Sequence, residues 1–318
     1  MMKILPPLVL LMSLFFVAGC NEIWSESSIE PSNQSQNTGI DENATSINSE
    51  LGRKKSAPED HSESLNRDAD YRILSWNVES EGADSDVIAT QLKELNTNDH
   101  YDVLTLVEVM PADLKKFRYA LGKHYKYAYS KSGRNDRLEI LYNEDKFELV
   151  RHFELKEINI LNRYRAPLVA HLKDRSNGTE FLVMVNHLAR GKAEIRQQQA
   201  SMLVEWARDQ TLPVFALGDY NFDFVFSTRK GNRGFVNMMR DNIWRWVEPG
   251  ELIDTNWYDN PREPDGKDDH PESILDFVFL AGPAKTWETA SNVIVRDGDF
   301  PDDETTSDHR PLELLLSK

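Results

Sequence analysis

Cysteine is nearly absent from this chain of 318 residues, which contains only Cys20. A lone cysteine cannot form an intramolecular disulfide, so the fold must depend on its hydrophobic core rather than on cross-links. Basic residues are also scarce, because 37 lysines and arginines face 53 acidic residues and the formal net charge is −16. A chain this acidic does not hold nucleic acid by bulk electrostatics. A polyanionic substrate would therefore need a local basic patch or metal ions.

Aromatic residues are missing between Trp24 and Tyr71, in a segment that is rich in serine, asparagine and acidic residues. Such a segment cannot bury enough apolar surface to offset its chain entropy. We expect residues 21–70 to be a disordered tether that holds a folded domain away from a membrane surface. Long apolar runs are also missing after residue 20, so the sequence predicts no transmembrane helix.

The first 20 residues are typical of a secretory signal, with Lys3 followed by an apolar stretch from Leu8 to Val17. Ala18 and Gly19 stand directly before Cys20, as small residues do in a bacterial lipobox. In that interpretation Cys20 becomes the lipidated N-terminus; the alternative is an ordinary cleaved signal with a chance cysteine. We predict a monomer of the bacterial cell envelope, anchored by lipid at the outer membrane or the periplasmic face.

Residues 71–318 fit one α/β (α+β) domain. Apolar runs predict strands at Arg72–Val78, Val103–Val107, Leu138–Tyr142, Leu168–Leu172, Phe181–Val185, Val214–Leu217, Ile274–Leu280 and Leu312–Leu316. Helical spacing predicts helices over Asp86–Leu95, Pro111–Leu121 and Ala193–Asp209. Asn177-Gly178 supplies the turn of a hairpin. Strands outnumber helices and several links are short, so we predict a four-layer sandwich of two packed mixed β-sheets flanked by helices.

Polar side chains end six of these apolar runs. In chain order they are Asn77, Glu108, His187, Asp219 with Asn221, Asp276, and the pair Asp308-His309 within Ser307-Asp308-His309-Arg310-Pro311. Glu108 or Asp219 alone is more often a helix N-cap or turn residue than a metal ligand. Taken together as an ordered set at strand ends, the six groups are hard to explain by core packing, and they predict one polar cleft.

Hydrolysis of a phosphodiester requires stabilised charge on the non-bridging oxygens, an aligned and deprotonated water, and a protonated or metal-bound leaving oxygen. Mg²⁺ takes oxygen ligands from one or two carboxylates and keeps several waters. Glu108, Asp219 and Asp308 are the candidate carboxylates, with Asn77 and Asn221 as neutral partners.

Two histidines are the candidates for proton transfer. They are His309 and His187, and a neighbouring carboxylate would fix the tautomer of each ring and raise its basicity. Asp276 is the obvious partner for His309. A histidine packed at a strand end without a catalytic role remains the alternative for His187.

The ordered set resembles the endonuclease/exonuclease/phosphatase superfamily, to which deoxyribonuclease I belongs, over essentially all of residues 71–318. The specific parts of the resemblance are Ser307-Asp308-His309, Gly218-Asp219-Tyr220-Asn221, Arg165-Ala166-Pro167 and the helical pattern of Arg196, Gln199 and Leu203. The chain departs from the family pattern at Val107, where glutamine is usual, at Asn186, where threonine is common, and at Tyr220.

The resemblance implies a role for each member of the set. Glu108 is the principal metal ligand with Asn77 nearby, and Asp308 and Asp219 complete the metal and water cluster. The implied ion is Mg²⁺, with Mn²⁺ or Ca²⁺ as alternatives, and Asn221 contacts the scissile phosphate.

The resemblance also assigns the proton-transfer groups. His309, paired with Asp276, activates the attacking water, and His187 contacts or protonates the phosphate on its other side. Asp136 is a candidate carboxylate partner for His187, and Arg165 is a candidate substrate-binding residue.

Arg229, Lys230 and Arg233 stand out in an acidic chain and follow Asn221 closely. They are candidates for contacts with substrate phosphates, and a solvated charged loop is the alternative. We predict a metal-dependent phosphodiester hydrolase, first as an extracytoplasmic, membrane-tethered nuclease of endo or exo type with nucleic acid as substrate. The alternatives are a sphingomyelinase-like phospholipid phosphodiesterase or phosphatase, and a non-catalytic binding lipoprotein.

Overall fold

The computed structural model describes residues 69–301 and 305–318. The predicted signal peptide, Cys20 and all of the predicted tether except Ala69 and Asp70 lie outside the described residues. Within the described ranges, no helix has both the length and the apolar character needed to cross a membrane.

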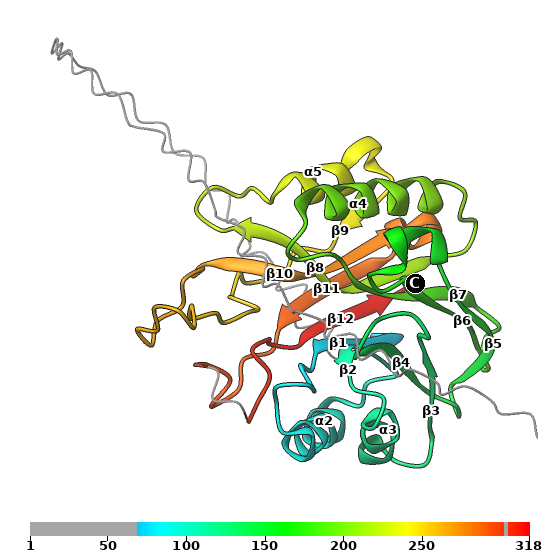
Figure 1. Ribbon diagram of the computed structural model, residues 1–318. Helices are drawn as coiled ribbons and strands as arrows, with labels where there is room; N and C mark the ends of the chain where they lie inside the picture. Colours follow the sequence, from blue (N-terminus) through cyan, green and yellow to red (C-terminus); the bar gives the residue numbers. More distant parts are fainter. Residues whose placement is uncertain (1–68, 302–304) are drawn as a thin grey trace, which may run out of the picture. The chain divides into compact units, whose positions relative to one another are not determined.

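Two six-stranded sheets form the centre of the domain (Figure 1). Sheet A has the order β11 (Glu288–Val293), β12 (Leu312–Ser317), β1 (Tyr71–Asn77), β2 (Val103–Val109), β4 (Arg137–Asn143) and β3 (Tyr125–Tyr129). Sheet B has the order β5 (Phe147–Glu154), β6 (Leu168–Asp174), β7 (Glu180–His187), β8 (Val214–Val225), β10 (Ser273–Ala281) and β9 (Arg245–Trp246). Both sheets are mixed, because β1–β2 and β7–β8 are parallel and the other pairs are antiparallel.

Helices cover the outer face of each sheet. Helices α2 (Ser85–Asp99) and α3 (Leu114–Leu121) pack on sheet A, while α4 (Ala193–Arg208) and α5 (Arg233–Met238) pack on sheet B (Figure 1). Short 3₁₀ segments link the strands at η1 (Lys156–Ile158), η2 (Ile160–Asn162), η3 (Arg240–Asn242) and η4 (Gly282–Thr286). The predicted four-layer sandwich is confirmed.

The main core lies between the sheets. It combines buried side chains from both, such as Ile73 and Leu314 of sheet A with Phe215 and Val278 of sheet B. Two further clusters fill the spaces between sheet A and α2–α3 and between sheet B and α4–α5. The central strands of both sheets, such as β2, β7 and β10, are therefore buried on both faces, which explains their nearly continuous apolar runs. The outer strand β5 is largely exposed.

One buried residue breaks the apolar pattern of β4. Leu138 and Ile140 face the core between the sheets, so Glu139 and Leu141 face the helices of the outer layer. Glu139 is fully buried, and neither of its carboxylate oxygens has a hydrogen-bond partner among the described residues. Burial therefore raises the pKa of Glu139 well above its usual value.

Candidate active site

Three neighbouring strands of sheet B place one row of reactive groups. The pairing of β7 with β8 sets His187 beside Asp219, and the pairing of β8 with β10 sets Asp219 beside Asp276. The approach of β7 and β8 is very close here, because a Cβ on Gly218 would lie 2.2 Å from the carbonyl oxygen of Asn186. The glycine in the Gly218-Asp219 motif therefore allows the row to form.

Sheet A supplies the facing groups. Asn77 ends β1, and its Nδ2 donates a hydrogen bond of 3.4 Å to Oδ2 of Asp219. Glu108 lies in β2 with φ of 60°, where the pairing with β4 shifts register between Leu106 and Val109. Such a bulge redirects a side chain, and here it places Oε1 of Glu108 at 3.5 Å from Nε2 of His187.

The segment before β12 delivers the second histidine. Ser307 Oγ donates to the carbonyl of Asn77 at 2.6 Å and accepts from the His309 amide at 3.0 Å. Trp76 Nε1 donates to the carbonyl of His309 at 2.8 Å. These bonds fasten the Ser307-Asp308-His309 motif to the end of β1, so the predicted residues from both ends of the domain meet.

His309 and Asp276 form a buried pair, with 2.7 Å between Nδ1 and Oδ2. The Nε2 atom of the same ring lies 4.0 Å from Oδ2 of Asp219 and 3.7 Å from Oδ1 of Asp308. Burial lowers the pKa of His309, but Asp276 and Asp308 raise it more, so its pKa is well above the usual value. The Asp276 contact fixes the ring so that Nε2 is the atom available for proton transfer.

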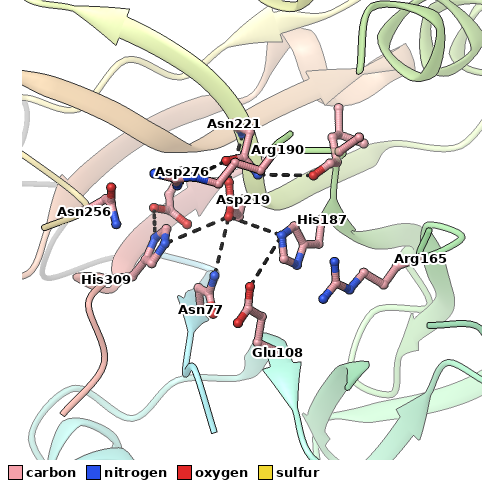
Figure 2. Close-up of polar contacts among 12 residues, drawn as sticks. Asn77, Glu108, Arg165, His187, Arg190, Asp219, Asn221, Asn256, Asp276 and His309 are labelled. Carbon is pink, nitrogen blue, oxygen red and sulfur yellow. Dashed lines mark hydrogen bonds and ion pairs between the residues drawn. The ribbon is translucent and has the colours of Figure 1, made fainter. Parts of the chain in front are cut away.

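His187 lies on the other side of Asp219, as Figure 2 shows. Its Nε2 is 3.5 Å from Glu108 and 3.6 Å from Asp219. Burial, with the nearby Arg165 and His309 charges, holds the pKa of His187 well below its usual value, so the ring is neutral. Its Nδ1 is buried with no hydrogen-bond partner among the described residues. An unpaired acceptor is easier to bury than an unpaired N–H, so we place the ring proton on Nε2, toward the carboxylates.

Negative charge is concentrated between the two histidines. Burial raises the pKa of Asp219 to about 7; His309 opposes the shift, while Asp276 and Glu108 add to it. Burial also raises the pKa of Glu108. Among the described residues these carboxyl groups outnumber the nearby cationic groups, which is the charge pattern of a site that binds a cation.

Asn221 is held in a left-handed conformation, with φ of 53°. Its amide donates to Oδ1 of Asp219 at 2.9 Å, and its Nδ2 donates to the carbonyl of Leu188 at 3.2 Å. Arg190 Nη1 donates to Oδ1 of Asn221 at 3.4 Å (Figure 2). Arg190 was not predicted from the sequence, although a basic residue three positions after His187 in an acidic chain was an available signal.

The helical motif of α4 supports the Arg190 loop. Arg196 Nη1 donates to the carbonyls of Ala189 and Arg190 at 2.9 and 2.6 Å. Gln199 Oε1 accepts from the Ala189 amide at 2.9 Å, while its Nε2 donates to the carbonyl of Ile158 at 3.3 Å. The Arg-x-x-Gln pattern thus positions the backbone that carries Arg190.

Asp136 is not the partner of His187, so that prediction is wrong. Its carboxylate binds Arg165 instead, with Arg165 Nε donating to Oδ1 at 2.7 Å and Nη2 contacting Oδ2. The carboxylates near His187 are Glu108 and Asp219. Asp136 orients the guanidinium of Arg165. Arg165 adds positive charge beside Glu108 and His187, and Figure 2 shows its side chain next to His187.

The predicted basic rim is only partly joined to the site. The Arg229 side chain is 58% exposed and forms an ion pair of 2.6 Å with Glu248. Arg233 begins α5. The contact with the site comes from Asn232, whose Nδ2 donates to the carbonyl of Asn221 at 2.8 Å. The loop that contains Lys230 is therefore tied to the site at its end, but no contact joins the three basic side chains to the predicted catalytic residues within the described part of the chain.

Two departures from the family pattern contact each other. Asn186 Nδ2 donates a buried hydrogen bond of 2.9 Å to the hydroxyl of Tyr220. The two residues lie on the paired strands β7 and β8, directly beside His187 and Asp219. The two departures from the family pattern are therefore coupled, because each residue provides the hydrogen-bond partner of the other behind the row of reactive groups.

The donor set fits a divalent cation. Among the described residues, no group of three or more His, Cys, Asp or Glu side chains converges as a preformed metal cage. Mg²⁺ does not require one, because it is usually bound through one or two carboxylates and several waters. Glu108 is 26% exposed at the side chain and Asp308 is 27% exposed, so both can still take an additional partner.

The chain belongs to the Endonuclease/Exonuclease/phosphatase family, whose model matches residues 74–309. This is a family of phosphoric ester hydrolases, so the fold and the site define a hydrolase. A comparison with curated protein sequences found no match.

Solved structures share the fold at low identity. D. rerio TDP2 complexed with a single-strand DNA product has a TM-score of 0.62 at 16% identity, over 78% of this chain and 99% of that one. A mannosyl-6-phosphatase from Bacteroides thetaiotaomicron has a TM-score of 0.59 at 18% identity, over 78% and 100%. The human Nocturnin catalytic domain with bound sulfate has a TM-score of 0.52 at 15% identity, over 78% and 94%.

Proposed function

We propose that this protein is a metal-dependent phosphodiester hydrolase that acts on nucleic acid. The observation that carries the proposal is the placement of two buried histidines, His309 and His187, on opposite sides of Asp219 (Figure 2). A phosphate between two such rings has one proton acceptor and one proton donor available, which are the groups that a displacement at phosphorus requires.

His309 is the general base for the attacking water. Asp276 accepts the Nδ1 proton at 2.7 Å, which leaves Nε2 to take a proton from water. The neutral imidazole is the active form, and the carboxylates around it raise its pKa. Activity should therefore be lost as the pH falls through that raised pKa.

His187 serves the opposite side of the phosphate. Its ring is neutral and its Nε2 proton points to the polar space beside Glu108 and Asp219. From there it can donate a hydrogen bond to a phosphoryl oxygen or a proton to the leaving oxygen.

The remaining donors bind the non-bridging oxygens. Arg165, oriented by Asp136, and Arg190, oriented by Asn221, bring two guanidinium groups to a site crowded with carboxylates. Preorganised donors of this kind stabilise the charge that develops in the transition state. Glu108, Asn77 and Asp308 are the residues that would hold Mg²⁺, with Mn²⁺ or Ca²⁺ as alternatives. Such an ion supplies Lewis-acid polarisation of a phosphoryl oxygen.

Two observations support nucleic acid as the substrate. The basic residues Arg229, Lys230 and Arg233 follow Asn221, and Asn232 joins their loop to the Asn221 carbonyl. D. rerio TDP2, which shares the fold, was crystallised with a single-strand DNA product.

The test is hydrolysis by the purified protein, with Mg²⁺ and with EDTA. The panel holds plasmid DNA, single-stranded DNA, RNA, sphingomyelin and mannose 6-phosphate. His309→Ala is the inactive variant, and His124→Ala, at an exposed histidine paired with Asp145, is its matched control. Metal-dependent cleavage of DNA or RNA that only His309→Ala abolishes supports the proposal. If nucleic acid is not cleaved while another ester is hydrolysed rapidly, nucleic acid is refuted as the substrate.

A phospholipid phosphodiesterase is the second candidate. Leu161 is 72% exposed and has φ of 57°, on the connection four residues before Arg165. An exposed leucine on a strained loop near the site is suited to docking at a lipid interface. Sphingomyelin turnover that falls in Leu161→Ser would favour this candidate. If no ester is hydrolysed, the remaining alternative is a non-catalytic lipoprotein that binds a partner.

We also propose that Cys20 anchors the enzyme by lipid at the cell envelope. The supporting observation is the small-residue pattern Ala18-Gly19-Cys20 after an apolar stretch. Metabolic labelling with a fatty-acid analogue should mark the wild type and spare Cys20→Ala. Equal labelling of both proteins would refute the anchor.

A further inference from the structure

The partly exposed ring of Tyr258 lies close to the candidate active site, and the guanidinium of Arg190 connects the two. Tyr258 is 37% exposed, and Cζ of Arg190 lies 5.8 Å from the centre of its ring. The same guanidinium donates through Nη1 to Oδ1 of Asn221 at 3.4 Å. Arg190 therefore joins a residue of the site to an aromatic surface that the proposed reaction does not use.

A second ring extends this surface. The rings of Tyr258 and His270 are stacked, with 5.8 Å between their centres and 10° between their planes. His270 is exposed as well. The two rings therefore form one aromatic stack beside the site, to which a further ring can add.

Hydrogen bonds hold the stack in place relative to the catalytic segment. The Trp257 amide donates to the carbonyl of Asp308 at 2.8 Å, immediately before Tyr258 in the chain. Asp268 Oδ1 accepts from the amides of both Tyr258 and His270, at 3.2 and 3.0 Å. The Asp268 carboxylate thus positions the backbone of both residues, and the bond from Trp257 ties this segment to the one that carries His309. A stacking partner would bind to a surface that is already ordered.

We propose that the Tyr258–His270 pair is a stacking subsite for the base of a nucleotide whose phosphate lies against Arg190 and Asn221. This inference rests on the proposed function and deepens it. Base–aromatic stacking accepts any base, because every base has a π-face. The connection that carries the pair is acidic on balance, with Asp259 and Asp269 near the rings in sequence, while Asp265 is paired with Lys267 at 2.9 Å. These charges disfavour a continuing polyanion, so the subsite takes a single base beside the scissile phosphate.

The experiment compares a thymidine dinucleotide with its two analogues that lack one base or the other. Tyr258→Ala should lower kcat/KM for the intact dinucleotide by about 5- to 150-fold, mainly through KM. Tyr258→Phe keeps the ring and should stay within about twofold. His270→Ala, at an exposed position, should lower kcat/KM in the same direction. One of the abasic analogues should be a poor substrate for the wild type and should not respond to Tyr258→Ala.

Calorimetry separates this inference from the proposed function. Dinucleotide binding is measured in His309→Ala and in the same protein with Tyr258→Ala added, with circular dichroism as the folding control. Weaker dinucleotide binding in the protein that lacks the Tyr258 ring supports the subsite. If the wild type hydrolyses no nucleotide, that result refutes the proposed function but leaves the subsite supported. If Tyr258→Ala leaves kcat/KM for the dinucleotide unchanged, the subsite is refuted but the proposed function is not. If Tyr258→Ala lowers kcat/KM equally for the intact dinucleotide and for both abasic analogues, the subsite is also refuted, because the ring would then contact the sugar rather than a base.

Discussion

The buried carboxyl group of Glu139 should make the protein less stable as the pH rises. Its oxygens lack hydrogen-bond partners among the described residues, and burial raises its pKa well above the usual value. In the unfolded chain the same group ionises freely near pH 4.3, at about the ordinary pKa of glutamate. Between these two pKa values the folded state binds more protons than the unfolded state, so the free energy of unfolding falls as the pH increases.

The magnitude follows from the linkage relation. Each pH unit inside that window costs about 1.4 kcal/mol of stability. Glu139→Gln has no such titration and keeps the polar atoms, so its advantage over the wild type should grow by about 1.4 kcal/mol for each unit. Glu139→Leu also removes the unpaired polar atoms, which cost about 1–3 kcal/mol. It should be the most stable of the three proteins.

Urea unfolding of the three proteins at pH 5, 6, 7 and 8 measures these differences. The slope of the unfolding free energy with urea concentration should be the same for all three, which shows that the exposed surface is unchanged. A difference between Glu139→Gln and the wild type that does not vary with pH would refute the reasoning. It would mean that the carboxyl group finds a partner, such as a bound water, that keeps its pKa near the ordinary value.

Three further predictions concern the site. Asp276→Asn should lower kcat by about 10- to 150-fold, because a charge-assisted hydrogen bond of about 1.5–3 kcal/mol is weakened. It should also move the acid limb of the pH–rate profile to lower pH, since Asp276 raises the pKa of His309; an unmoved limb would contradict the assignment of the base. Tyr220→Phe should cost about 1–3 kcal/mol in urea unfolding, because the Asn186 amide loses its partner; adding Asn186→Thr should recover part of that loss. Arg190→Lys should raise KM while it keeps the charge, because a lysine cannot contact Asn221 and a phosphate with the same planar fork; an unchanged KM would remove Arg190 from the substrate site.

Much of the fold was predictable because the central strands of the two sheets are buried on both faces, whereas the partly exposed strands β3, β5, β9 and β11 were not predicted. The apolar runs of the central strands stand out in the sequence, as at Val103–Val109 and Ser273–Ala281. Strand β8 was predicted to end at Leu217, yet it continues to Val225. The polar residues Asp219 and Asn221 interrupt its apolar pattern, because they belong to the site rather than to the core. The strand therefore continues through the residues at which the apolar pattern stops.

The members of the site were predictable, but several of their contacts were not. Reactive residues at strand ends can be recognised from local patterns, whereas their partners depend on tertiary distances. Asp136 follows a glycine-containing loop, and nothing in its neighbourhood indicates that its partner is Arg165, 29 residues away. Arg190 lies in a loop whose path is set by the distant side chains of Arg196 and Gln199.

The bonds that fasten the Ser307-Asp308-His309 segment to β1 also determine when the site can exist during folding. Asn77 and Ser307 are 230 residues apart in the chain, and Trp76 and His309 are 233 apart. Contacts of such long range form only after the loop-closure entropy between them has been overcome. Recovery of activity on refolding should therefore lag behind the return of secondary structure. A partly folded chain that lacks these contacts would have no competent site, so the return of catalysis would report a late step of folding.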